Sequence, residues 1–183
     1  MDNRSRKIIL LAHCLLNQNS IVEGLARYHA MVRELIDILH KYGIGIIQLP
    51  CPEMLHSGLR RWWQVREQYD NPGFRRIARE LVKPVIDYLL EYKRNGFQVL
   101  GLIGVSGSPS CGVHYTSSSN SWLGNPSRAK PSKRVSGRGV FIQILVEEAA
   151  KNNIQLPLLL EYDYDDPDNS IKRIEEVLKE HVD

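Results

Sequence analysis

The sequence predicts an α/β fold: a single three-layer domain with a mostly parallel sheet of four or slightly more strands and helices on both faces, flavodoxin-like or Rossmann-like. The chain has 183 residues, of which 43% are hydrophobic, so it has the size of one domain and can bury roughly 70% of its unfolded surface. Short apolar runs alternate with sequence of helical period, which is typical of α/β proteins. The runs are nearly continuous, as expected for parallel strands covered on both faces. We therefore expect one domain over residues 1–183.

Four short, partly β-branched apolar runs predict the strands. Parallel strands are joined by right-handed crossovers, which leave few arrangements for a sheet of this size. The simplest is the flavodoxin-like spatial order 2-1-3-4. The predicted strands span residues 7–13, 44–49, 98–105 and 155–161.

Each apolar run is followed by a segment in which apolar residues recur every three to four positions, as in an amphipathic helix. Gly43 marks the end of the first segment, since glycine commonly follows the last residue of a helix. Pro84 lies inside the second segment, so we expect a kink or two shorter helices there. The predicted helices span residues 28–42, 74–94, 139–152 and 168–181.

The charge of the chain is close to balanced, with 24 Lys and Arg against 21 Asp and Glu and a net charge of +3. This excess is too slight to favour a nucleic-acid or membrane partner. The sequence contains no apolar run of the roughly 18 residues that cross a membrane, and the run at residues 8–12 is too short for a signal peptide. We expect a cytoplasmic protein with no membrane partner, and a homodimer is compatible with the sequence.

The three cysteines, Cys14, Cys51 and Cys111, are odd in number and far apart, which excludes a small disulfide scaffold. Each follows a predicted strand and begins or lies within a long loop. The carboxyl ends of parallel strands share one edge of the sheet, where ligands bind, so we expect the three thiols to meet there. The alternative is that they are small buried apolar residues, the commonest role of free cysteine.

Converging thiolates can hold more than one kind of metal centre. A structural zinc ion takes four ligands, so His13, His56 or His114 would have to add the fourth. An iron–sulfur cluster held by three cysteines keeps one iron open, and that iron can act as a Lewis acid on a substrate. The residue types alone leave both centres open.

Four short motifs occur in a fixed order around the cysteines. They are CLLN at residues 14–17, CPE at 51–53 with Gly58 and Leu59 after it, SPSCG at 108–112, and GRGV at 137–140. In these motifs the chain resembles the DUF523 family, which includes the 2-thiouracil desulfurases and whose usual pattern reads CLLG, CPE, SPSCG and GxGV. The resemblance spans residues 8 to about 150.

The resemblance implies a function and a set of site residues. It implies a [4Fe-4S] cluster with Cys14, Cys51 and Cys111 as ligands, assisted by Glu53 and by Ser108 or Ser110. The implied enzyme is a desulfidase whose open iron accepts sulfur from a small thiolated, thiouracil-like compound. A carboxylate suits such a reaction, because the attacking water must lose a proton. The alternative function is a non-catalytic zinc-binding or redox-sensing α/β module.

The chain departs from the family pattern at three places that concern the substrate. Asn17 replaces the glycine of CLLG, residues 23–28 replace an arginine-tyrosine-aspartate-glycine element, and residues 59–66 replace a proline-rich segment. These departures place the chain in a related desulfidase-like group. All three tryptophans lie in loops at the cysteine edge, where an indole can stack on a flat heterocycle and an arginine can meet an anionic group. We expect the substrate to be bound by Trp62, Trp63, Trp122 and Arg61.

Overall fold

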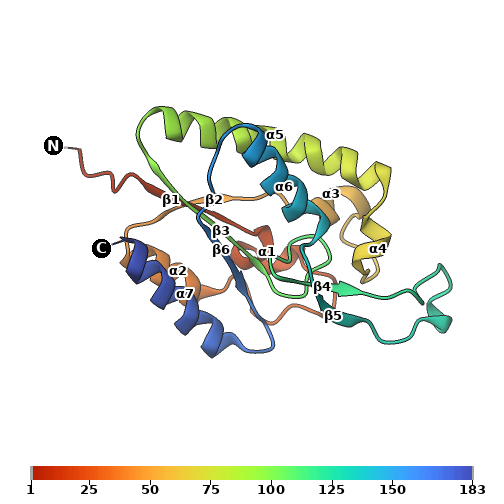
Figure 1. Cartoon of the computed structure of the whole chain (residues 1–183). Coiled ribbons are helices and arrows are strands. Elements are labelled where there is room, and N and C mark those ends of the chain that lie inside the picture. Colours follow the sequence, from red (N-terminus) through yellow and green to blue (C-terminus); the bar gives the residue numbers. More distant parts are fainter. Residues whose placement is uncertain (1, 183) are drawn as a thin grey trace.

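Four parallel strands lie at the centre of the computed structural model, which describes residues 2–182 (Figure 1). They are β1 (Lys7–Leu11), β2 (Gly45–Gln48), β3 (Gln98–Val105) and β6 (Leu158–Tyr162), and their spatial order is β2-β1-β3-β6. All three neighbouring pairs are parallel. This arrangement is the predicted order 2-1-3-4, so the predicted fold class is confirmed.

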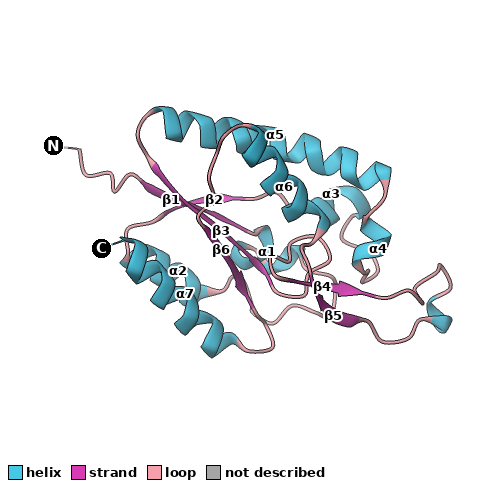
Figure 2. Cartoon of the chain, viewed as in Figure 1, coloured by secondary structure: helices cyan, strands magenta, loops and turns pink. Residues whose placement is uncertain are grey.

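Helices cover both faces of the sheet (Figure 2). The long helix α5 (Pro72–Arg94) packs against α6 (Val140–Lys151) and β3 on one face. On the other face α2 (Arg33–Lys41) packs against α7 (Pro167–Val182), which also contacts β6. Three layers result, as the alternation of apolar strands and amphipathic helices predicts.

The two central strands supply the middle of the core. Ile9, Leu10 and Leu11 of β1 and Leu102 and Ile103 of β3 have no exposed surface. Side chains on both faces of these strands are buried, because helices lie above and below. This is why the strands read as continuous apolar runs rather than as alternating ones.

The first long helix begins later than the sequence predicts, at Arg33 rather than near Tyr28. The preceding residues pair with the chain that follows β1: the Ala30 carbonyl accepts from the Gln18 amide, and the Val32 amide donates to the Leu15 carbonyl, at 2.8 and 2.9 Å. These tertiary hydrogen bonds take backbone groups that a longer helix would use. The apolar period at residues 28–32 therefore reflects packing of an irregular segment.

Helix α5 continues through Pro84 as one element of 23 residues, so the alternative of two shorter helices was wrong. Pro84 itself is exposed, which lets water reach the backbone carbonyl that the proline cannot bond. On the opposite face Val82, Val85 and Ile86 are buried. Packing of this face on both sides of Pro84 keeps the helix continuous.

The remaining elements are short and surround the carboxyl edge of the sheet. A hairpin of β4 (Tyr115–Ser118) and β5 (Lys133–Ser136) lies in the chain between β3 and α6. The others are α1 (His13–Leu16), η1 (Gln18–Ser20), α3 (Pro52–Ser57), α4 (Arg66–Tyr69) and η2 (Pro126–Arg128). Within residues 2–182 no helix is long and apolar enough to cross a lipid bilayer.

Replacing Gly101 by alanine should destabilise the protein by roughly 3 kcal/mol, because the site combines strain with overpacking. Gly101 has a φ of +143°, and an added Cβ would overlap the backbone of Leu158 in β6. Gly45→Ala is the control, since its Cβ would lie 3.4 Å from the nearest atom. Urea unfolding of both variants measures the difference. Equal stability of the two variants would contradict this assignment.

Candidate active site

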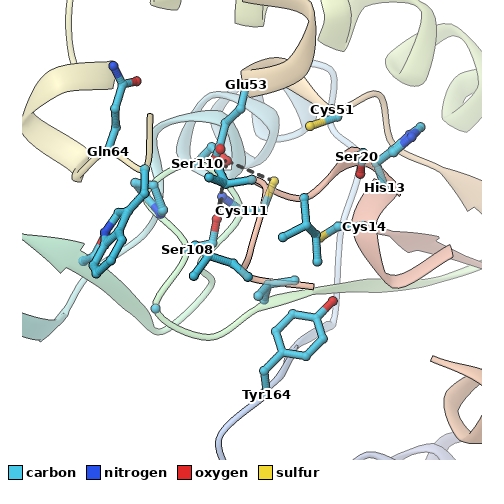
Figure 3. Close-up of a pocket in the computed structure, with 18 of the residues that line it drawn as sticks. His13, Cys14, Ser20, Cys51, Glu53, Gln64, Ser108, Ser110, Cys111 and Tyr164 are labelled. Carbon is cyan, nitrogen blue, oxygen red and sulfur yellow. Dashed lines mark hydrogen bonds between the residues drawn. The ribbon is translucent and has the colours of Figure 1, made fainter. Parts of the chain in front are cut away.

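The loops after all four strands of the sheet line one cavity of about 250 Å³. The loops after β1, β2 and β3 contribute Cys14, Cys51 and Cys111, and the loop after β6 contributes Tyr164. Figure 3 shows the three sulfur atoms and the tyrosine hydroxyl around the same space. The predicted meeting of the cysteines at the carboxyl edge is thus what the structure shows.

Local hydrogen bonds orient two of the three cysteines. Cys51 stands at the N-terminus of α3, where its Sγ accepts a hydrogen bond from the Met54 amide at 3.4 Å. The carbonyl of Cys111 accepts from the Val105 amide at 2.9 Å, which folds the loop back over the end of β3. The Sγ of Cys111 lies 3.4 Å from the Ser110 hydroxyl (Figure 3).

The Cys111 loop lies against its neighbours by backbone contact. A Cβ on Gly104 of β3 would overlap the carbonyl of Cys111, and a Cβ on Gly139, before α6, would overlap the backbone of Ser110. The Glu161 side chain holds the next residues, since one carboxylate oxygen accepts from the amides of Val113 and His114 at 3.0 and 2.9 Å. Gly104 of β3 and Gly139 of the GRGV motif are therefore steric requirements for placing Ser110 and Cys111.

Burial makes the three thiols weak acids. Burial, with smaller contributions from the charges of Cys51 and Glu53, raises the pKa of Cys14 to about 12. It also raises the pKa of Cys111 well above its usual value, with smaller contributions from Cys14 and Cys51. Burial is again the main reason why the pKa of Cys51 is raised. A bound cation would reverse this penalty by favouring the thiolates.

The arrangement of the cysteines is compatible with an iron–sulfur cluster. Within residues 2–182, no group of three or more His, Cys, Asp and Glu side chains is gathered closely enough to hold one metal ion. The three cysteines instead stand around a cavity, and each would bind a different iron of a four-iron cluster. Cys14, Cys51 and Cys111 are therefore compatible with a cluster that fills the space between them.

The histidines considered as fourth zinc ligands mostly lie elsewhere. Nε2 of His114 is 2.8 Å from the Leu159 carbonyl, and Nδ1 of His56 is 2.7 Å from the Ser57 hydroxyl. Of the three candidates, His13 alone lines the cavity, and its ring points away from the sulfur atoms in Figure 3.

Glu53 is held at the wall of the cavity by a serine and an arginine. Its Oε1 accepts from the Ser110 hydroxyl at 2.6 Å, and its Oε2 accepts from Nε of Arg61 at 3.2 Å. The side chain of Glu53 is 13% exposed and that of Arg61 is 3% exposed. Ser108 lies one step further away, because its Oγ is 3.4 Å from Ser110 Oγ and accepts from the Cys111 amide at 3.0 Å.

The four residues predicted to bind substrate occupy different places. Trp63 lines the cysteine cavity, whereas Trp62 and Trp122 line a neighbouring hollow of about 380 Å³ that shares Trp63. The rings of Trp63 and Trp122 have centroids 5.5 Å apart, and Trp62 is 78% exposed. Arg61 lines the cavity but is buried and also donates to the carbonyls of Gly58 and Ser20 at 3.1 and 2.8 Å.

Two residues that line the cavity were not predicted from the sequence. Tyr164 and Ser117 both line the cavity, and the Ser117 Oγ is buried without a hydrogen-bond partner in the described part of the chain. The rule that located the cysteines, which is to inspect the loop after each strand, would also have found Tyr164. No signal distinguished Ser117 within its serine-rich segment.

The chain is similar to known proteins along most of its length. The family model described as "Putative 2-thiouracil desulfurase" matches residues 6–131, a range that contains all three cysteines and Glu53. An uncharacterized protein of Methanocaldococcus jannaschii is 31% identical over 178 residues, which cover 96% of this chain and 99% of that protein. A solved structure described as the [4Fe-4S]-dependent thiouracil desulfidase TudS has 15% identity and a TM-score of 0.49, and covers 93% of this chain and 99% of its own.

Arg61→Ala should lower the free energy of unfolding by roughly 3–5 kcal/mol, because it leaves the Glu53 carboxylate partly buried without its cation. Lys83→Ala is the matched control, since Lys83 pairs with Glu80 at 2.7 Å on the exposed face of α5. Loss of that exposed pair should cost less than about 1 kcal/mol. Denaturant unfolding of both variants compares the two pairs, and similar losses would show that the Arg61 pair is not structurally special.

Proposed function

We propose, since this chain belongs to the 2-thiouracil desulfurase family, that it is an iron–sulfur-dependent desulfidase acting on a small thiolated, thiouracil-like compound. The observation that carries this proposal is the convergence of three cysteines, Glu53 and Ser110 on one cavity. A soft metal centre, a carboxylate and a space for a small ring are the parts that removal of sulfur from a heterocycle requires.

Cys14, Cys51 and Cys111 would hold a [4Fe-4S] cluster in this proposal. When bound, a cluster with three cysteine ligands supplies an open iron that can accept sulfur from the substrate. The protein contributes the thiolates and a cavity whose charged groups, Glu53 and Arg61, pair with each other.

Glu53 is the proposed general base. Replacing a C=S group by C=O consumes one water and releases H₂S, so the attacking water must give up a proton. Each carboxylate oxygen can accept more than one hydrogen bond, and the bonds from Ser110 and Arg61 therefore leave room for water. Ser110, rather than Ser108, directly contacts Glu53 and also lies next to the Cys111 sulfur.

Arg61 is proposed to act on the substrate through Glu53 rather than by direct binding. Its Nε bonds to Glu53, while NH1 and NH2 bond to two backbone carbonyls. These contacts tie the carboxylate to the loop before α4 and to the end of η1. The guanidinium thus fixes the direction in which Glu53 faces the cavity.

The lining of the cavity favours an uncharged planar substrate. Glu53 and Arg61 are paired, and Ile21, Val22 and Val105 contribute apolar walls. We propose that Trp63 stacks on the substrate ring and that the Ser117 hydroxyl, which has no hydrogen-bond partner within residues 2–182, bonds to one of its polar atoms. Trp62 and Trp122 would then contact a substituent that extends into the adjacent hollow.

Anaerobically reconstituted protein should absorb broadly near 400 nm, roughly as iron–sulfur chromophores do. Alanine at Cys14, Cys51 or Cys111 should abolish this band, because each thiolate is assigned as a ligand. Ser106→Ala, which changes the same cavity wall, should leave it intact. Iron and sulfide analysis accompanies the spectra. An undiminished band in any of the cysteine variants would contradict the ligand set.

Glu53→Gln should keep the cluster and slow sulfide release from 2-thiouracil by about 10²–10⁴-fold, the usual contribution of a general base. The amide retains the shape of the carboxylate but cannot take up the proton of water. Glu80→Gln, on the exposed face of α5, is the control and should release sulfide at the unmodified rate. Sulfide release near the unmodified rate in Glu53→Gln would remove Glu53 from the mechanism.

A further inference from the structure

Tyr164 brings the loop after β6 to the cysteine cavity, and no role is yet assigned to it. Its phenol reaches into the cavity, and Figure 3 shows the hydroxyl directed toward Cys14. The ring is held in place by its neighbours: the centroids of Tyr164 and Tyr162 are 5.2 Å apart, and those of Tyr164 and Tyr28 are 6.2 Å apart. The direction of its hydroxyl proton depends on what the oxygen already binds.

Gln18 determines which way that proton can point. Its side chain is buried, and its Oε1 accepts from the backbone amides of Arg27 and Tyr28 at 3.1 and 3.3 Å. An amide oxygen that accepts two backbone N–H groups cannot be exchanged with its nitrogen. The Nε2 of Gln18 therefore faces the cysteine side, where it donates to the Cys14 carbonyl at 2.8 Å and to the Tyr164 hydroxyl oxygen at 2.6 Å.

The Tyr164 oxygen is consequently an acceptor toward Gln18, and its own proton needs another partner. The neighbouring hydroxyls of Tyr28 and Tyr162 bond to each other. Cys14 remains as the group that the hydroxyl faces across the cavity. Burial dominates the raised pKa of Cys14, and the nearby Tyr164 hydroxyl opposes that rise.

We infer that the Tyr164 hydroxyl, oriented by Gln18, donates a hydrogen bond to the Sγ of Cys14 and so tunes the reduction potential of the cluster held there. The inference rests on the proposed function, because it concerns the same three ligands. It adds a donor for the Cys14 sulfur to the Met54 amide that donates to Cys51, whereas the single hydroxyl proton of Ser110 is donated to Glu53. Tyr164 is a positioning residue, not a ligand.

The expected effect follows from charge. A hydrogen bond to a ligating sulfur stabilises negative charge on the cluster, and reduction adds negative charge. Removal of the donor should therefore make reduction harder. Because the potential is a property of the loaded protein without substrate, its measurement does not depend on turnover.

Tyr164→Phe removes only the hydroxyl, and its reconstituted cluster should show a more negative midpoint potential in an anaerobic EPR titration without substrate. Tyr162→Phe is the matched control, because it removes a hydroxyl that bonds to Tyr28 from an adjacent ring. The control should keep the unmodified potential. Equal potentials for Tyr164→Phe and the unmodified protein, or equal shifts in both variants, would overturn the inference.

A second variant keeps the test independent of how well Tyr164→Phe folds. Gln18→Met leaves the tyrosine in place but removes the amide that orients it, so the potential should shift in the same direction by a smaller amount. An unchanged potential in Gln18→Met would overturn the role of Gln18. Unmodified protein that holds a cluster but releases no sulfide would contradict the proposed function alone.

Discussion

The backbone of the Cys111 loop lies so close to β3 and to the start of α6 that no side chain fits between them. Gly104 and Gly139 make this approach sterically allowed. The hydrogen bond from the Val105 amide to the Cys111 carbonyl closes the loop at 2.9 Å. One consequence is that Ser110 and Cys111 face the cavity side by side. Another is that the β4–β5 hairpin leaves from the same place, which brings Ser117 to the cavity wall.

The charges of the site follow from this packing. Glu53 enters from α3 and meets Ser110 on one side and Arg61 on the other, so the one carboxylate of the cavity is neutralised within the protein. The three thiols line the same cavity, and their raised pKa values favour the neutral thiol until a cation binds. The site is therefore suited to a cationic metal centre and an uncharged substrate ring.

The fold was largely predictable from the sequence, because buried parallel strands produce continuous apolar runs and glycines end the helices. The positions of the cysteines after three strands predicted their convergence. Tertiary contacts explain why the start of α2 and the continuity of α5 were predicted wrongly. The backbone of residues 28–32 forms hydrogen bonds with the segment after β1 instead of joining α2. Helix α5 remains continuous at Pro84 because its buried face is well packed.

The candidate site was predictable only in part. The role of Arg61 depends on the depth at which its guanidinium lies, which a sequence does not record. Gln18 resembles any polar loop residue until its four hydrogen bonds are seen together. Tyr164 was predictable in the same way as the cysteines, because it follows a strand at the carboxyl edge of the sheet. The buried position of the Ser117 hydroxyl depends instead on how the β4–β5 hairpin folds over the cavity.

The central claim is that three cysteines hold one cluster and leave one iron open to the sulfur of the substrate. Mössbauer spectroscopy of protein reconstituted with ⁵⁷Fe, before and after addition of 2-thiouracil, tests this claim most directly. One iron subsite of a [4Fe-4S] cluster should differ from the other irons and change when the thiolated compound is added. A spectrum in which all irons are equivalent and unaffected by 2-thiouracil would contradict the account, as would zinc bound in place of iron.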